Sequence, residues 1–137
     1  MSRQCPVAMQ ILENAVRIGL RLPPNASRSR VWRSTVLLAE FSLTPLDKGP
    51  SVSPWVSRSL DIIDQSGVPY RLGPMGTCVE GEWDEVMAVA KACFEHMAGD
   101  CERISISFKG DWRRGASGRL TAKIEKVEAT LGRKLKT

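Results

Sequence analysis

The chain has 137 residues, of which 42% are hydrophobic and 26% are charged, proportions typical of one globular domain with its own core. No apolar run reaches the ~18 residues that a membrane-spanning helix needs, which argues against an integral membrane protein. The formal net charge of +5 lies entirely in residues 1–33, where six arginines accompany one glutamate. Because residues 34–137 carry 14 basic and 14 acidic side chains, they offer no basic surface for nucleic acid.

Residues 1–33 differ in composition from the rest of the chain. They contain RLPPNASRSR, which is typical of a linker, and they are rich in arginine and poor in acids, like an organellar transit peptide. We expect a flexible N-terminal extension outside the fold, and a domain formed by residues 34–137. The four cysteines lack C-x-x-C spacing and there is one histidine, so we expect no metal site and free thiols in the cytoplasm. The transit-peptide interpretation stays open.

The first predicted elements are a strand and a helix. Residues 35–44, TVLLAEFSLT, are β-branched and apolar, and Pro45 stops them. A helix follows, with Ser53 as its N-cap and Pro54 in its first position, and Gly67 ends it.

Two short strands come next, at about 69–73 and 76–81, joined by a turn that begins and ends with glycine. The sequence EWDEVMAVAKACFEHMAGD predicts the strongest helix, because its apolar residues recur every three or four positions and acids occupy its first turn. ERISISFKGD then alternates like a strand, and residues 117–132 form a last amphipathic helix.

The order β-α-β-β-α-β-α predicts an α+β fold, a ferredoxin-like βαββαβ sandwich with an additional C-terminal helix. Its four-stranded antiparallel sheet has two helices on one face, and we expect the other face, the open face, to be uncovered by its own chain. The residues assigned to the open face are Val36, Leu38, Glu40, Ser42, Cys78, Glu80, Ser105 and Ser107. Two large apolar residues there predict packing against the sheet of another subunit, so we expect oligomers.

The same face is the best candidate for a binding site. The sequence contains no P-loop, no G-x-S-x-G and no H-E-x-x-H, so we expect no enzyme. The first strand is central in this fold, which lets the polar side chains of the open face converge into a small-molecule pocket. Glu40 and Glu80 favour a cationic or amine-bearing ligand. An alternative is that these two carboxylates only keep the sheet soluble.

Three stretches, AEFSLTPL, GVPYRLGPMGTCVEGEWDEVM and ERISISFKGDWR, resemble the thiamine-binding protein family over about residues 35–132. The resemblance implies non-catalytic binding of thiamine or its hydroxymethylpyrimidine part, with no other cofactor required. It also implies dimers whose open sheets stack, often paired into tetramers. The family positions fall on Ser42, Thr77, Glu80, Asp111 and Arg113. The chain departs from the family pattern at Cys78 and Trp112.

We therefore expect a cytoplasmic oligomer that carries or senses thiamine or a related pyrimidine. The rival hypothesis is a structural or regulatory assembly module with no small-molecule ligand. A third hypothesis, an enzyme with Cys78 as nucleophile, requires that thiol to ionise near neutral pH.

Overall fold

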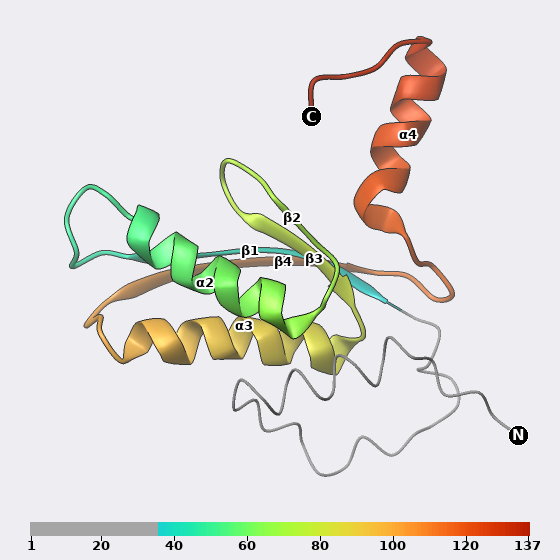
Figure 1. The fold of residues 1–137 in the computed structure, drawn as a ribbon. Coiled ribbons are helices and arrows are strands. Elements are labelled where there is room, and N and C mark those ends of the chain that lie inside the picture. Colours follow the sequence, from blue (N-terminus) through green and yellow to red (C-terminus); the bar gives the residue numbers. More distant parts are fainter. Residues whose placement is uncertain (1–35) are drawn as a thin grey trace, which may run out of the picture.

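The computed structural model describes residues 36–137, so the prediction of a flexible extension or transit peptide at residues 1–33 lies outside the described part. The described elements, in chain order, are β1 (Leu37–Pro45), α2 (Ser53–Ser66), β2 (Tyr70–Leu72), β3 (Thr77–Gly81), α3 (Trp83–Ala98), β4 (Ile104–Trp112) and α4 (Arg119–Leu131). The strands form one antiparallel sheet in the order β2-β3-β1-β4. Figure 1 shows α2 and α3 together on one side of this sheet, and α4 rising on the other. This is the predicted ferredoxin-like α+β fold with its additional C-terminal helix.

The core lies between β1 and the two helices that cover it. Side chains alternate between the two faces of a strand, so every second residue of β1 points toward the helices. All five of these residues are buried, namely Leu37, Ala39, Phe41, Leu43 and Pro45. The first four pack with Ile63 of α2 and with the buried side of α3, which consists of Val86, Val89, Cys93 and Met97. Burial of each large apolar side chain stabilises the fold by about 1.5–3 kcal/mol. Because β1 supplies several of these side chains, it is the central strand of the core.

The ends of α2 and α3 show how local chemistry sets the helix boundaries. In α2 the prediction for Ser53 is wrong by one position. The backbone C=O of Val52 accepts bonds from the N–H groups of Trp55 and Val56, so Val52 is the N-cap and Ser53 already belongs to the helix. Gly67 ends α2 as predicted, in the left-handed conformation that glycine adopts without strain.

Helix α3 begins with a reciprocal pair of bonds between its first residues. The Glu85 carboxylate accepts the backbone N–H of Glu82 at 2.9 Å, and the Glu82 carboxylate accepts the backbone N–H of Glu85. Such a capping box satisfies N–H groups that have no partner inside the helix. It also fixes the start of α3 directly after Gly81, the last residue of β3, where an added Cβ would come 3.1 Å from Glu85 Oε2.

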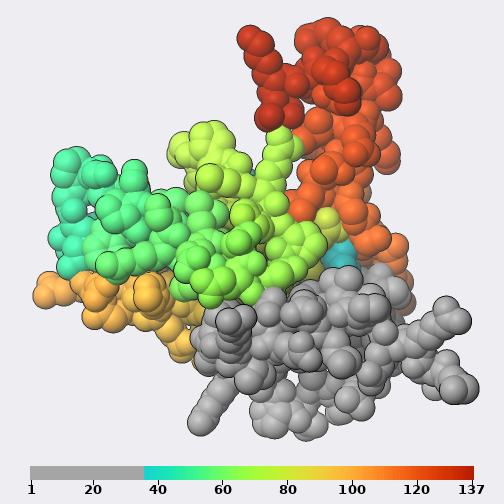
Figure 2. All heavy atoms as spheres, in the orientation of Figure 1, coloured from blue at the N-terminus to red at the C-terminus, as the bar shows by residue number. Residues whose placement is uncertain are grey.

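Helix α4 differs from the other two helices because none of its residues is buried. It follows β4 through a connector that contains two left-handed glycines, Gly115 and Gly118. Figure 2 shows α4 and the C-terminal tail projecting from the body that the sheet and the other helices form. In the described part of the chain, no helix is long and apolar enough to cross a membrane.

Candidate ligand-binding face

A row of polar side chains crosses the middle of the open face. The register places Glu40 of β1 opposite Cys78 of β3 on one side and opposite Lys109 of β4 on the other. Cys78 in turn lies opposite Arg71 of β2. Directly opposed residues have side chains on the same face of a sheet. The Glu40 carboxylate therefore has Lys109 on one side and, beyond Cys78, Arg71 on the other.

Glu40 is the carboxylate of this row that remains accessible. Its residue is exposed, and within residues 36–137 its only hydrogen-bond contact is a weak one from the Cys78 thiol, with Sγ 3.8 Å from Oε2. The side chain lies over Gly76, where an added Cβ would come 3.2 Å from Glu40 Cγ. A glycine at this position therefore leaves the space that the Glu40 side chain occupies.

The environment of Cys78 bears on its chemistry. Burial, and then the negative charge of Glu40, raise the pKa of the Cys78 thiol above its ordinary value. A raised pKa keeps the thiol protonated at neutral pH, whereas a cysteine nucleophile acts as the thiolate. The raised pKa therefore argues against Cys78 as a nucleophile and is consistent with a packing role for its side chain.

Hydroxyl groups form the next row of the open face. Ser42 lies opposite Ser107, and Thr44 lies opposite Ser105. Ser42 is two residues from Glu40 on the same face of β1, about 7 Å along the strand. The accessible carboxylate thus has a half-buried hydroxyl as its neighbour.

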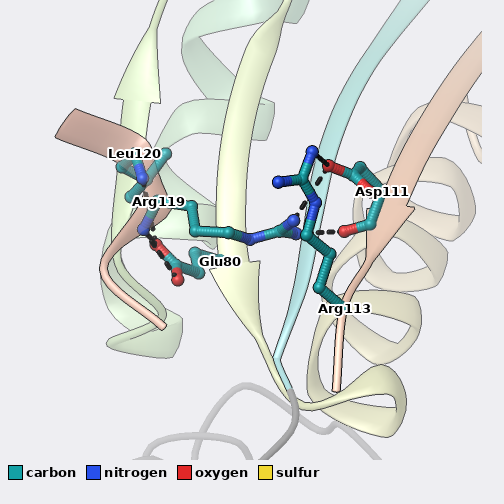
Figure 3. A network of polar contacts seen from close by, with 5 residues as sticks. All are labelled: Glu80, Asp111, Arg113, Arg119 and Leu120. Atoms are coloured by element: carbon teal, nitrogen blue, oxygen red, sulfur yellow. Dashed lines mark hydrogen bonds and ion pairs between the residues drawn. The ribbon is translucent and has the colours of Figure 1, made fainter. Parts of the chain in front are cut away.

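Glu80 has a different role from Glu40, although both were expected to face a ligand. Glu80 is 6% exposed, and its carboxylate accepts backbone N–H groups from the start of α4. The N–H of Arg119 lies 2.9 Å from Oε2 and 3.1 Å from Oε1, and the N–H of Leu120 lies 3.1 Å from Oε2 (Figure 3). The Glu80 carboxylate on β3 thus caps α4, whose own N-cap residue makes no side-chain bond to the helix. The prediction that the chain leaves the open face uncovered is therefore wrong at one end, where the first turn of α4 lies on it.

The side chain of Arg119 extends from α4 across the sheet to β4. Its Nη1 lies 2.9 Å from Asp111 Oδ2, and its Nη2 donates to the Asp111 carbonyl (Figure 3). Leu38 pairs with Glu80 on one side and with Asp111 on the other, so the Arg119 side chain passes over this leucine. Part of the apolar surface that predicted stacking is thus covered within the chain. Arg113 joins the same carboxylate, with Nη2 3.3 Å from Asp111 Oδ2.

A hollow of about 310 Å³ lies beside this network. Val36, Pro69 and Glu80 line its sheet side, and Ser117, Leu120 and Thr121 line the side of α4. A hollow of about 450 Å³ lies near the other end of α4, between residues of the helix and the C-terminal tail, and touches none of the open-face side chains.

The predicted site residues thus fall into three places. Glu40 and Ser42 lie in the middle of the open face, while Glu80, Asp111 and Arg113 gather at the end that α4 covers. Thr77 is buried opposite Phe41, on the face that the helices cover, and does not join either group.

Sequence reasoning missed three charged residues of this face. Arg71 and Lys109 could have been found by extending the strand alternation across the register. The position of Arg119 could not, because nothing in the sequence shows that the last helix turns back onto the sheet.

A model of the thiamine-binding protein family matches residues 39–128, most of the described part of the chain. The chain belongs to the thiamine-binding protein family. Among relatives of known sequence, a UPF0045 protein of Mycobacterium bovis is 38% identical over 96 residues, which cover 69% of this chain and 94% of the relative. A UPF0045 protein of Synechocystis is 31% identical over 107 residues, covering 77% of this chain and 88% of the relative.

Solved structures of this fold agree with the architecture. A hypothetical protein of Methanocaldococcus jannaschii superposes with a TM-score of 0.63 at 28% identity, covering 67% of this chain and 95% of that protein. A Thermotoga maritima protein, described as a candidate for thiamine biosynthesis or salvage, superposes with a TM-score of 0.60. At 22% identity, over 67% of this chain and 98% of that protein, it supports the fold alone.

Membership of the thiamine-binding protein family supports a thiamine-related role for this chain. The family is named for binding, and no catalytic function is indicated for it.

Proposed function

We propose that the open face binds thiamine, or the hydroxymethylpyrimidine part of it, without catalysis, and that the protein acts as a carrier or sensor. The observation that carries the proposal is the accessible Glu40 carboxylate in the middle of the open face, beside the hydroxyls of Ser42 and Ser107. Thiamine combines a cationic ring with an aminopyrimidine. The ring favours a negative charge, and the amine donates to carboxylate and hydroxyl oxygens.

The roles of the two carboxylates are different in this proposal. Glu40 contacts the ligand, because the Cys78 thiol is its only partner among the described residues and leaves most of its acceptor capacity free. Glu80 positions the start of α4, whose residues Leu120 and Thr121 line the hollow at the edge of the face. Thr77 supports the fold from the other side of the sheet.

Self-association through stacked open faces belongs to the same proposal. The described open face carries three acids, Glu40, Glu80 and Asp111, and four bases, Arg71, Lys109, Arg113 and Arg119. A face with nearly balanced charge meets a second copy of itself with little net repulsion, and a partner sheet would exclude water from a bound ligand. A dimer formed in this way, or a tetramer of two such dimers, would act in the cytoplasm.

Calorimetric titration of the intact oligomer with thiamine and with hydroxymethylpyrimidine tests the proposal. Glu40→Gln keeps the shape and removes the charge, and the loss of a charge-assisted hydrogen bond of about 1.4 kcal/mol predicts about tenfold weaker binding. Ser42→Ala should weaken binding about fivefold, from the loss of roughly 1 kcal/mol. Glu95→Gln, an exposed change on α3, is the matched control.

The rival function gives the opposite result. If the parent protein releases no saturable heat with either compound, the open face serves only assembly. Equal affinities of the parent and Glu40→Gln would likewise remove Glu40 from the site.

A further inference from the structure

Arg71 is a cation of the open face whose charge has no partner among the described residues. It lies on β2 opposite Cys78. Its neighbour Tyr70 points toward the helices, because the Tyr70 hydroxyl donates to Asp64 Oδ1 of α2 at 3.0 Å. Side chains alternate along a strand, so Arg71 points to the open face. The residue is half-buried there, and in the described part of the chain its guanidinium forms no hydrogen bond or ion pair.

The other arginines of this face differ from Arg71 in having an acid beside them. Arg119 and Arg113 both bind the Asp111 carboxylate, with nitrogen–oxygen distances of 2.9 and 3.3 Å (Figure 3). Glu40 lies in the same row as Arg71, yet no nitrogen of Arg71 comes within 4.0 Å of a carboxylate oxygen of the described residues. Removing a cation from water without an anion beside it costs free energy. The guanidinium therefore favours an anion that a ligand brings.

Glu40 and Arg71 are two sites of opposite charge with the Cys78 thiol between them. The register places Cys78 next to each of the two residues. Burial and the charge of Glu40 raise the pKa of this thiol, and the charge of Arg71 opposes the increase, so the thiol lies within the electrostatic reach of both groups. Neighbouring strands lie ~4.8 Å apart, which separates the backbones at Glu40 and Arg71 by about 10 Å. A ligand that fits both sites carries a positive and a negative charge at separate places.

We propose that the open face selects the phosphate monoester of its ligand, thiamine monophosphate, with Arg71 bound to the phosphate and Glu40 facing the cationic ring. This inference rests on the proposed function, because it takes thiamine binding by the open face as given. Thiamine carries a hydroxyl at the end of a two-carbon arm on its cationic ring, and a phosphate ester of this hydroxyl supplies the negative charge. A planar guanidinium donates two parallel N–H bonds to phosphate oxygens, and such charge-assisted pairs are among the strong hydrogen bonds of proteins.

Lys109, the other cation of this row, is less suited to the phosphate. It lies directly opposite Glu40, so a phosphate at its ammonium group would also lie against the Glu40 carboxylate. Lys109 is exposed, and water solvates an exposed ammonium group strongly. Arg71 is half-buried and is separated from Glu40 by Cys78. These differences favour the β2 side of the face for the phosphate, and they make Lys109 a matched control for the loss of one positive charge.

Calorimetric titration of the full chain with thiamine and with thiamine monophosphate tests the inference. The parent should bind the monophosphate about tenfold more tightly, because the phosphate adds a charge-assisted pair. Arg71→Gln keeps part of the side chain and removes its charge. This variant should lose the preference for the monophosphate, while its affinity for thiamine stays within about threefold of the parent.

Two further variants separate charge from geometry. Lys109→Gln should keep the preference for the monophosphate. Arg71→Lys keeps the charge and lacks the planar pair of donors, so its affinity for the monophosphate should lie between those of the parent and Arg71→Gln. Circular dichroism checks that every variant folds.

The outcomes distinguish this inference from the proposed function. A parent that binds both compounds with equal affinity overturns the inference and leaves thiamine binding in place. Loss of the preference in Lys109→Gln, with the preference kept in Arg71→Gln, overturns the assignment to Arg71. Equal losses for both compounds in Arg71→Gln show that Arg71 supports the face and does not hold the phosphate. If the parent binds neither compound, the proposed function fails and the inference fails with it.

Discussion

The strongest single prediction concerns Glu80→Ala, which removes the acceptor that holds the start of α4. The carboxylate is almost fully buried and accepts two backbone N–H groups, those of Arg119 and Leu120, at 2.9–3.1 Å. Hydrogen bonds to a charged group contribute about 1.5–3 kcal/mol each, and a lost N-cap costs about 0.5–2 kcal/mol. Because these terms overlap, we expect the docking of α4 to weaken by about 2–4 kcal/mol.

The effect should stay local. Helix α4 has 13 residues and none of them is buried, and an isolated helix of this length is marginal in water. A loss of 2–4 kcal/mol corresponds to roughly 30- to 1,000-fold faster amide exchange wherever exchange follows opening of α4. Helices α2 and α3 form the core and should keep their protection.

Hydrogen exchange followed by mass spectrometry measures this directly, with peptides from residues 119–131 compared with peptides from α3. Glu40→Ala is the control, because it removes a carboxylate from the same face that does not touch α4. Unchanged exchange of α4 in Glu80→Ala would refute the view that Glu80 anchors the helix. An equal loss of protection in α3 would show that Glu80 instead supports the whole domain.

Two further predictions concern titratable groups. The N–H of Glu102 donates to the Asp47 carboxylate at 2.8 Å and holds the Asp47 pKa below its ordinary value. The resulting stability exists above the unfolded pKa and disappears as pH falls through the folded one. In urea titrations, Asp47→Asn should therefore be less stable than the parent at pH 7, and the difference should close below about pH 4. Burial raises the pKa of the Cys93 thiol to about 12. Native Cys93 should resist alkylation at pH 8 and react once the chain unfolds, and its contribution to stability should decline as pH rises above 9. Fast labelling of Cys93 in the native protein would contradict this.

The sequence predicted the fold well because its strands and helices obey their periodicities. The alternation in β1 gave both faces correctly, with Phe41 in the core and Glu40 exposed on the open face. The error at Ser53 arose because a serine is only one way to start α2, and the backbone carbonyl of Val52 started it one residue earlier.

The candidate site was less predictable for a physical reason. Glu40 and Glu80 have equivalent positions in a strand pattern, and only the course of α4 distinguishes them. That course depends on the connector around Gly115 and Gly118, where glycine permits several backbone paths. A local pattern cannot predict a contact between residues 39 positions apart, such as that of Glu80 with Arg119.

The strand order β2-β3-β1-β4 determines when the sheet can form during synthesis of the chain. Both neighbours of β1 follow it in the chain, and β2 pairs only with β3. A nascent chain that has reached Leu72 therefore contains two strands of the sheet and no pairing between them. Contacts so distant in sequence close slowly, and the sheet is complete only when β4 leaves the ribosome. The open face consequently begins to form only after β3 has been made and is complete only with β4, so no fragment that ends before β3 can contain it.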